Sequence, residues 1–470
     1  MSKGFFKDTI IYGMSVTIAK LLLFISVPIF TRLMSVESYG IVGFIGSLIG
    51  LIGIVMKIGT NNAVQRYYFD VDDTFKNNVI SSGLKVLFVF SSFVLLFSMI
   101  LVTIFEEYFN TRNISLTVLF ISLAYIFFFQ YIVFIKDIVR LYFKPWIYFF
   151  LEIVPIVFGV LLALLFVSYF NLNVEGYFLG YAIGTFMVLI MAFIFFKKEF
   201  YFKEKTKFKK ELISFGYPFI FVGLASWVFQ SADRWMLLEL TDAKEVGLYS
   251  VAYQISSILL LFVTTFGIVW GPYAMKLLKN KSHKEIYAIV GTIWYLIIVY
   301  IAFIVSLFFN NIVELILDER YYTSMETGLL LVATIIFIGT VQMSVLGISI
   351  ARKTKVLPWI TGFMAFLNII LNYFLIPEYF AFGAALSTLI SNFLLTLFYF
   401  IYSQKYYYIP YDKTKLIFIT GIIVIFYLSL WTTKIVSFTI YFKLAIVFGI
   451  GILFILWMLH EWKQIILLVK

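Results

Sequence analysis

An acid and a base, Asp233 and Arg234, stand side by side near the end of an apolar run, ISFGYPFIFVGLASWVFQ. Ionised groups in hydrocarbon are costly unless they are paired or hydrated, so this couple marks a candidate functional site. An arginine can bind phosphate oxygens in pairs, and a carboxylate can hold a cation or a proton. The alternative is structural: the two charges neutralise each other or reach the outer interface along their own side chains.

Lys20 is a second charge inside an apolar run. It lies about 11 residues beyond Thr9, which at about 1.5 Å per residue places it about 16 Å deep, near the midplane of a bilayer. Because an ammonium cannot easily reach water from this depth, we expect Lys20 to face a hydrated cavity and to bind an anionic group there. An ion pair with Glu152 is the structural alternative.

Lys57 and Arg66 are further candidates for binding an anion. Lys57 is within two turns of the expected cytoplasmic surface, so its side chain could equally extend into water. Arg66, in NNAVQRYYFD, is expected just outside the membrane, where it could receive an anionic headgroup first. A surface arginine with no special role is the alternative.

A set of uncharged oxygen ligands is expected in the outer half of the membrane. Asn368 and Asn372 are four residues apart and share one helix face, and Thr388 lies at a similar depth in the next span. With Asp233 and a backbone carbonyl such as that of Ala384, they offer the hard oxygen ligands that suit a monovalent cation. The alternatives are hydrogen bonding between helices, which is common for Asn and Thr in membranes, or a proton held by the carboxylate.

The elements that position these groups are membrane-spanning helices. The 470 residues are 63% hydrophobic and 13% charged, whereas soluble proteins are about 25% charged. Apolar runs of roughly 20 residues, the length that spans a bilayer as a helix, recur along the chain. The sequence therefore predicts an all-α membrane protein with about fourteen spans, near residues 9–31, 38–58, 79–104, 116–135, 146–168, 177–196, 213–238, 246–270, 286–309, 325–350, 358–376, 380–402, 416–431 and 438–459.

Lysine and arginine are distributed unevenly over the connections between these spans. One side has 26 of them and the other has 5, which predicts that the richer side, with both termini, is cytoplasmic. The basic run from Lys197 to Glu211 is the longest such connection, and it could bind anionic lipid heads or serve as a solvated linker. This asymmetry accounts for the net charge of +11 without a nucleic-acid partner.

Two glycine pairs indicate a duplication. Gly40 and Gly247 each open a span after an acidic turn, Gly176 and Gly383 open two others, and both pairs are 207 residues apart. A repeat with an even number of spans gives two copies of the same orientation, as in transporters that rock two lobes around a central site. We expect a six-helix lobe over 1–205, a second over 206–405, and two accessory helices over 406–470.

Three stretches resemble a known family. SADRWMLLELTDAKEVGLYSVAYQISSILLLFVTTFGIVWGPYAMK, IFTRLMSVESYGIVGF and NYFLIPEYFAFGAALSTLISN are similar to signatures of the polysaccharide-flippase branch of the multidrug/oligosaccharidyl-lipid/polysaccharide (MOP) exporter superfamily. The resemblance implies a transporter in the bacterial cytoplasmic membrane that flips an undecaprenyl-diphosphate-linked oligosaccharide to the outer leaflet. O-antigen, capsule and teichoic polymers are the substrates of this branch. The partners that the resemblance implies are membrane lipids and other proteins of surface-polysaccharide assembly.

The resemblance also bears on the sites. Asp233, Asn368, Ala384 and Thr388 align with the sodium ligands of lipid II flippases in the same superfamily, whereas Asn372 stands where those proteins have a second carboxylate. The ion is therefore expected to be Na+ or H+, with no other cofactor or metal. The lipid II flippases also carry an Arg-Asp pair in the first span, where this sequence has Ser26 and Val27, and this departure weakens the lipid II interpretation.

Three other functions remain open from the sequence. An exporter of small organic cations would need carboxylates deep in the first lobe, where this chain has Lys20. A lipid II flippase is the second alternative. A polysaccharide polymerase or ligase would need a large outer loop bearing Arg or His, and the outer loops predicted here are short.

Overall fold

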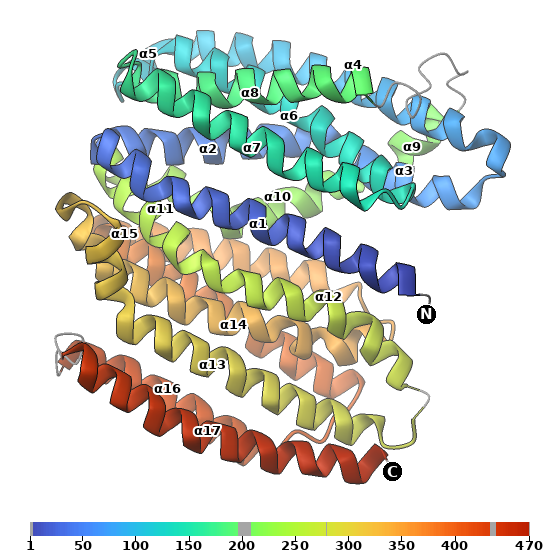
Figure 1. The fold of residues 1–470 in the computed structure, drawn as a ribbon, viewed down its shortest axis with the longest axis vertical. Coiled ribbons are helices and arrows are strands. Elements are labelled where there is room, and N and C mark those ends of the chain that lie inside the picture. Colours follow the sequence, from blue (N-terminus) through green and yellow to red (C-terminus); the bar gives the residue numbers. More distant parts are fainter. Residues whose placement is uncertain (1–2, 196–207, 279, 433–438, 470) are drawn as a thin grey trace. The chain divides into compact units, whose positions relative to one another are not determined.

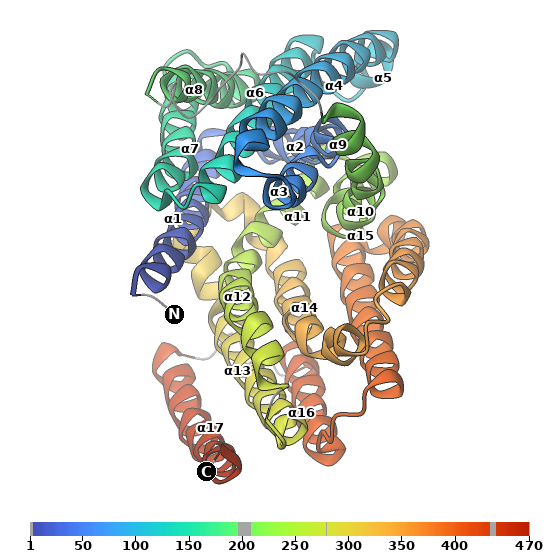
Figure 2. The same cartoon turned by 90° about the vertical axis from the view of Figure 1, so that its right-hand side faces the viewer.

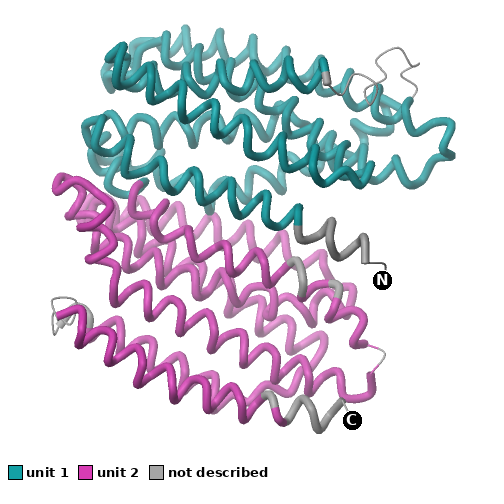
Figure 3. Tube along the Cα trace, viewed as in Figure 1, with its two compact units in different colours: residues 1–250 teal, residues 251–470 magenta. Residues whose placement is uncertain are grey.

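The computed structural model describes residues 3–195, 208–278, 280–432 and 439–469, and this part of the chain is helical, without strands (Figure 1). The chain divides into two compact units, unit 1 from Met1 to Ser250 and unit 2 from Val251 to Lys470, which are coloured separately in Figure 3. The all-α prediction is confirmed. The residues 196–207, which include most of the predicted basic connection, lie outside the described residues.

Unit 1 contains ten helices and most of an eleventh within the described residues. They are α1 (Lys3–Leu33), α2 (Val36–Lys57), α3 (Thr60–Asp70), α4 (Lys76–Ile104), α5 (Glu106–Asn110), α6 (Leu116–Leu141), α7 (Pro145–Ser168), α8 (Asn173–Phe195), α9 (Lys209–Gly216), α10 (Pro218–Leu240) and α11 (Ala243–Ser256).

Local sequence explains where several of these helices begin. Ser35 caps α2 by accepting a hydrogen bond from the backbone nitrogen of Ser38 at 3.1 Å, and Ser115 caps α6 in the same way. α7 and α10 begin with Pro145 and Pro218, a position where proline costs nothing because the first-turn N–H groups have no partner within the helix. Polar and proline residues thus separate runs that would otherwise be continuously apolar.

The break between α2 and α3 depends on a glycine. Ile58 and Gly59 both have positive φ, 45° and 64°, and turn the chain so that α3 leaves the direction of α2. A side chain at Gly59 would overlap the backbone carbonyl of Gly216 at the end of α9. α9 also contributes Leu212 to the apolar cluster formed by α3, α4, α6, α7 and α8, so the short helix before α10 is anchored to the first part of the chain.

Unit 2 contains the end of α11 and six further helices within the described residues. They are α12 (Leu260–Leu277), α13 (His283–Ile316), α14 (Met325–Ile350), α15 (Val356–Tyr406), α16 (Lys413–Thr432) and α17 (Ile440–Val469), with short 3-10 turns at Ser257–Leu259 and Glu319–Ser324.

α15 is two antiparallel helices joined at Phe380, which has φ 52° and ψ −135°. A side chain at Gly383 would overlap the carbonyl oxygen of Leu375, so the chain folds back tightly on itself at this point. The hydroxyls of Thr361 and Tyr399, equally far from Phe380 along the chain, are 2.5 Å apart. The two helices occupy the region marked α15 in Figure 2.

The predicted spans correspond to these helices. Twelve helices in the described part of the chain are long and apolar enough to cross a membrane. α15 counts once among the twelve although it folds back, and α16 is an additional apolar helix that is not counted, so a total of about fourteen spans agrees with the structure. The division into compact units falls after Ser250, whereas the sequence predicts a lobe boundary near residue 205, and the lobes remain a prediction.

Candidate functional site

Lys20 lies on α1 and is half-buried. Among the described residues of unit 1, none accepts a hydrogen bond from its ammonium or forms an ion pair with it. Glu152, the partner considered from the sequence, is instead bound to Lys136, with 2.5 Å between Nζ and Oε2 and with both side chains about 15% exposed or less. Glu152 therefore binds Lys136 and is not the ion-pair partner of Lys20 that the structural alternative requires.

Lys57, at the end of α2, is half-buried near a group of polar side chains from α3 and α6. Asp137 and Lys136 are the charged residues close enough to act on it electrostatically. The Asp137 carboxylate accepts a hydrogen bond from Nδ2 of Asn61 and pairs with Arg140 at 3.1 Å. Lys57 thus belongs to a mixed charge cluster rather than standing alone.

Arg66 is exposed on α3, and its guanidinium pairs with Asp70 one turn later at 3.1 Å. The side chain is 61% exposed, so the pair is in contact with solvent or with lipid headgroups. Such pairs are weak, and an incoming phosphate could replace the carboxylate at little cost.

Asp233 and Arg234 on α10 each contact a residue of α11. The carboxylate of Asp233, which is 1% exposed, accepts a hydrogen bond from the hydroxyl of Tyr249 at 2.5 Å. Nε of Arg234 donates to Oγ of Ser250 at 3.2 Å, and its guanidinium lies 5.8 Å from the centre of the Tyr249 ring. The adjacent residues Asp233 and Arg234 are thus hydrogen-bonded to the adjacent residues Tyr249 and Ser250 on the next helix.

The candidate ion ligands of unit 2 lie on the two halves of α15 and are buried. Asn368 and Asn372 are fully buried and share a helix face as predicted, with Nδ2 of Asn372 donating to Oδ1 of Asn368 at 3.2 Å. The hydroxyl of Thr388 donates to the carbonyl of Ala384 at 3.0 Å. Nδ2 of Asn368 has no hydrogen-bond partner among the described residues.

The fold of α15 brings these residues to one level. Asn372 and Thr388 are equally far from the turn at Phe380, so they lie at similar depth on antiparallel helices. Asn392, one turn beyond Thr388, is level with Asn368 and donates to the carbonyl of Thr388 at 2.8 Å. Asp233 belongs to unit 1 and these residues to unit 2. That they share one cation remains a prediction.

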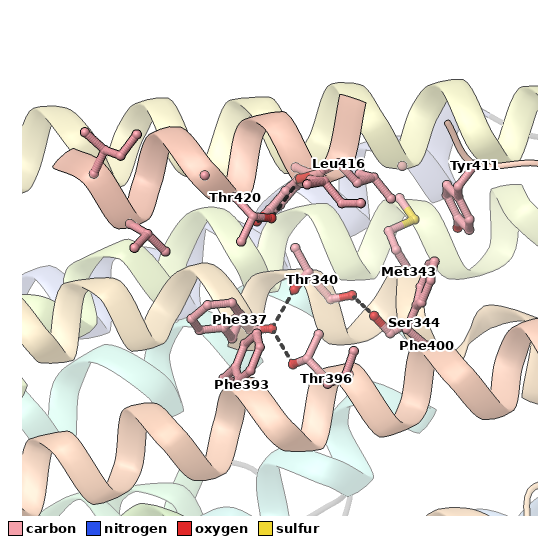
Figure 4. Close-up of a pocket in the computed structure, with 17 residues that line it drawn as sticks. Phe337, Thr340, Met343, Ser344, Phe393, Thr396, Phe400, Tyr411, Leu416 and Thr420 are labelled. Carbon is pink, nitrogen blue, oxygen red and sulfur yellow. Dashed lines mark hydrogen bonds between the residues drawn. The ribbon is translucent and has the colours of Figure 1, made fainter. Parts of the chain in front are cut away.

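Unit 2 also contains a cavity of about 640 Å³ between α13, α14, α15 and α16 (Figure 4). Three lining threonines donate their hydroxyls to backbone carbonyls, Thr340 and Thr396 to that of Phe337 and Thr420 to that of Leu416. The buried hydroxyl of Tyr411 has no partner among the described residues. The surface left for an occupant is therefore mostly hydrocarbon and aromatic. Such a cavity suits part of a lipid tail rather than a sugar or a phosphate.

Sequence reasoning missed Tyr249, Lys136 and Asn392. Tyr249 follows Asp233 by 16 residues in the neighbouring span, and a tyrosine in an aromatic-rich chain gives little signal by itself. Lys136 lies one residue beyond the predicted span 116–135 and is therefore predicted to belong to a connection, whereas α6 continues to Leu141. Its pairing with Glu152 in the following span could have been proposed from opposite charges at similar depth.

Comparison with known proteins agrees with this architecture. A family model described as "Polysaccharide biosynthesis protein" matches residues 5–278. A protein of the Lsg locus of Haemophilus influenzae is 21% identical over 283 residues, which cover 59% of this chain and 67% of that protein.

Two solved structures have the same fold. The lipid II flippase MurJ, in an inward closed conformation, has a TM-score of 0.74 at 16% identity, covering 97% of this chain and 100% of its own. An inward-facing multidrug resistance MATE transporter of the MOP superfamily has a TM-score of 0.65 at 14% identity, covering 82% and 94%. The chain thus has the fold of MOP-superfamily transporters and belongs to the polysaccharide biosynthesis protein family.

Proposed function

We propose that this chain is a flippase that moves an undecaprenyl-diphosphate-linked oligosaccharide from the inner to the outer leaflet of the bacterial cytoplasmic membrane. Membership of the polysaccharide biosynthesis family supports a glycan-related substrate, and the transporter fold supports translocation rather than synthesis. The proposed mechanism is alternating access between lobes 1–205 and 206–405, with both termini cytoplasmic and with a cation gradient or the membrane potential as the driving force.

The observation that carries the proposal is Lys20. A lysine near the midplane of a membrane is costly, and this one has no counter-charge among the described residues of its own unit. A diphosphate is the complementary group, and it is the part of a lipid-linked glycan that hydrocarbon excludes most strongly. Lys57, Arg66 and Arg234 are the further cations proposed to contact the headgroup along its path.

The polyprenyl tail places a different demand on the protein. It need not leave hydrocarbon, and the apolar cavity of unit 2 supports a tail that stays among helices α13 to α16 while the headgroup crosses elsewhere. Other proteins of surface-polysaccharide assembly are proposed to supply and consume the substrate, since its glycan is built on one face of the membrane and used on the other.

Replacing Lys20 tests the function directly. In a strain that lacks the gene, Lys20→Ala should abolish export of the surface glycan, and Lys20→Arg should retain part of it because the charge is kept. Lys85→Ala is the matched control, because Lys85 is an exposed lysine on α4 and should be dispensable. Full export by Lys20→Ala, with normal amounts of protein in the membrane, contradicts the proposal.

Two further assays separate the alternatives. Complementation of a strain depleted of its lipid II flippase would identify lipid II as a substrate, and resistance to cationic drugs on overexpression would identify a small-cation exporter. Failure in both, together with translocation of a polyprenyl-diphosphate glycan in proteoliposomes, is the expected result.

Ion coupling is tested by melting temperature. If sodium binds, NaCl should raise the melting temperature of the purified protein relative to KCl, because a ligand that binds only the folded state stabilises it. Asp233→Ala should remove this shift. An unchanged shift in that variant would show that Asp233 is not an ion ligand.

A further inference from the structure

Gln342 is an exposed polar side chain on a helix that is otherwise covered. Between Thr327 and Ile350, every residue of α14 is buried or partly buried except Gln342. It lies eight residues before Ile350, hence about 12 Å from the predicted cytoplasmic end of the helix. A glutamine side chain is too short to reach water over this distance. Because an amide in contact with hydrocarbon is costly, Gln342 must face a hydrated surface.

The carboxamide of Gln342 lies against α12, which packs beside α14 in unit 2 (Figure 2). A methyl group on Gly267 of α12 would overlap Nε2 of Gln342 and lie 2.6 Å from its Cδ, so only a glycine leaves room for the carboxamide there. Among the described residues of unit 2, none forms a hydrogen bond with it. Its two N–H donors and its carbonyl oxygen are therefore available to a ligand.

The face of α12 around Gly267 is open and uncharged. Thr264, one turn earlier, and Gly271, one turn later, lie on this face and are exposed. A methyl group on Gly271 would have no atom of the described neighbouring segments within 4 Å. The one charged residue of α12 is Lys276, nine residues beyond Gly267, and α14 has no charged residue after Glu326. The surface beside the carboxamide therefore suits a neutral, hydrogen-bonding ligand rather than an anion.

Trp294 of α13 fixes both helices at this level. Its ring is stacked on that of Phe266, the neighbour of Gly267, with 3.7 Å between the ring centres. Its Nε1 donates to the carbonyl of Gly339 on α14 at 2.8 Å, one turn before Gln342. A ligand at Gln342 therefore meets helices that are already in place, which lowers the entropic cost of binding.

We propose that Gln342 binds hydroxyl groups of the glycan and so contributes to the choice of substrate. The inference rests on the proposed function, because it names the part of the lipid-linked oligosaccharide that this side chain recognises. A carboxamide can donate to one sugar hydroxyl and accept from the next, which suits an uncharged polyol. The apolar cavity that suits the tail contacts α14 at other positions, Thr340, Met343 and Ser344. Tail and glycan thus contact different faces of the same helix.

The binding of two lipids tests this role. The probes are the lipid-linked repeat unit extracted from the strain that carries the gene, and undecaprenyl diphosphate, which has no sugar. Gln342→Leu nearly preserves the size of the side chain and removes its hydrogen bonds. The dissociation constant for the repeat unit should rise about tenfold, as expected for one or two lost hydrogen bonds, and that for undecaprenyl diphosphate should change by less than about twofold.

Two further variants complete the test. Gln65→Leu is the matched control, because Gln65 is exposed on α3 and lies outside the predicted spans. It should bind both lipids as the unmodified protein does. Gly267→Ala keeps the amide but displaces it from α12, and it should weaken binding of the repeat unit without weakening that of undecaprenyl diphosphate.

The outcomes separate this inference from the proposed function. If Gln342→Leu affects both lipids equally or neither of them, Gln342 does not recognise the glycan, and the flippase proposal stands. The same conclusion follows if the unmodified protein binds the two lipids equally tightly, since the glycan then contributes nothing. Failure of the unmodified protein to bind or translocate the repeat unit would instead overturn the proposed function.

Discussion

The candidate sites of the two units contain different kinds of polar group. Those of unit 1 contain ionisable side chains, namely the Lys136–Glu152 pair and Asp233 beside Tyr249. The candidate site of unit 2 buries neutral amides and hydroxyls instead, with Asn368 and Thr388 at most 4% exposed.

This difference has an energetic consequence. Burying an ion costs several kcal/mol unless a partner compensates it, whereas a neutral amide costs about 1–3 kcal/mol at most. The carboxylates of Glu152 and Asp233 accordingly each have a specific partner, whereas Nδ2 of Asn368 has none among the described residues. Loss of the partner of either carboxylate should therefore be more destabilising than substitution of Asn368.

The largest effect is expected at the Lys136–Glu152 pair. Glu152→Leu leaves the Lys136 ammonium buried without its partner and should lower the free energy of unfolding by about 3–5 kcal/mol. The double variant Lys136→Met with Glu152→Leu should recover most of this loss, because no unpaired charge remains. Chemical denaturation in detergent micelles measures both. Equal losses in the single and double variants would show that the pair is not an energetic unit.

Tyr249→Phe should have the next largest effect. It removes one hydrogen-bond donor from the buried Asp233 carboxylate, and hydrogen bonds to charged groups contribute about 1.5–3 kcal/mol. Tyr217→Phe, at an exposed tyrosine just before α10, is the control substitution. If Tyr249→Phe is no more destabilising than the control, the Asp233 carboxylate does not depend on this hydroxyl.

Asn368→Leu should change stability by less than about 1 kcal/mol, because the lost hydrogen bond to Asn372 is offset by removal of the unpartnered amide nitrogen. The same substitution should abolish any sodium-induced rise in melting temperature. Calorimetry in sodium and potassium buffers checks both effects. If the sodium-induced rise in melting temperature persists in this variant, Asn368 is not an ion ligand and contributes only to packing.

Arg66→Ala should have the smallest effect on stability, within about 0.5 kcal/mol, because its pair with Asp70 is largely exposed. Glycan export should nevertheless fall if Arg66 receives the headgroup. Gln65→Ala, the exposed neighbour on α3, is the control for export. Equal export by the two variants would show that Arg66 does not receive the headgroup.

The helical architecture could be predicted because a membrane restricts what a chain can do. Backbone groups in hydrocarbon must be paired within the segment, so a run of about 20 apolar residues becomes a helix whatever it packs against. The turn at Phe380 could also be placed, at the start of the predicted span 380–402, although nothing in the residue type indicates its positive φ. The end of α6 could not, because Lys136 and Arg140 read as loop residues until their partners are known.

The sequence alone was enough to predict the helical fold, the approximate position of each span, and the helix face shared by Asn368 and Asn372. All of these follow from local periodicity and length. Only the tertiary structure decided which groups meet: that Glu152 binds Lys136 rather than Lys20, that Asp233 faces Tyr249, and that Gly40 packs on Gly247. Partner choice depends on how helices far apart in the chain cross, and the apolar runs that place helices in a membrane are too alike to specify those crossings.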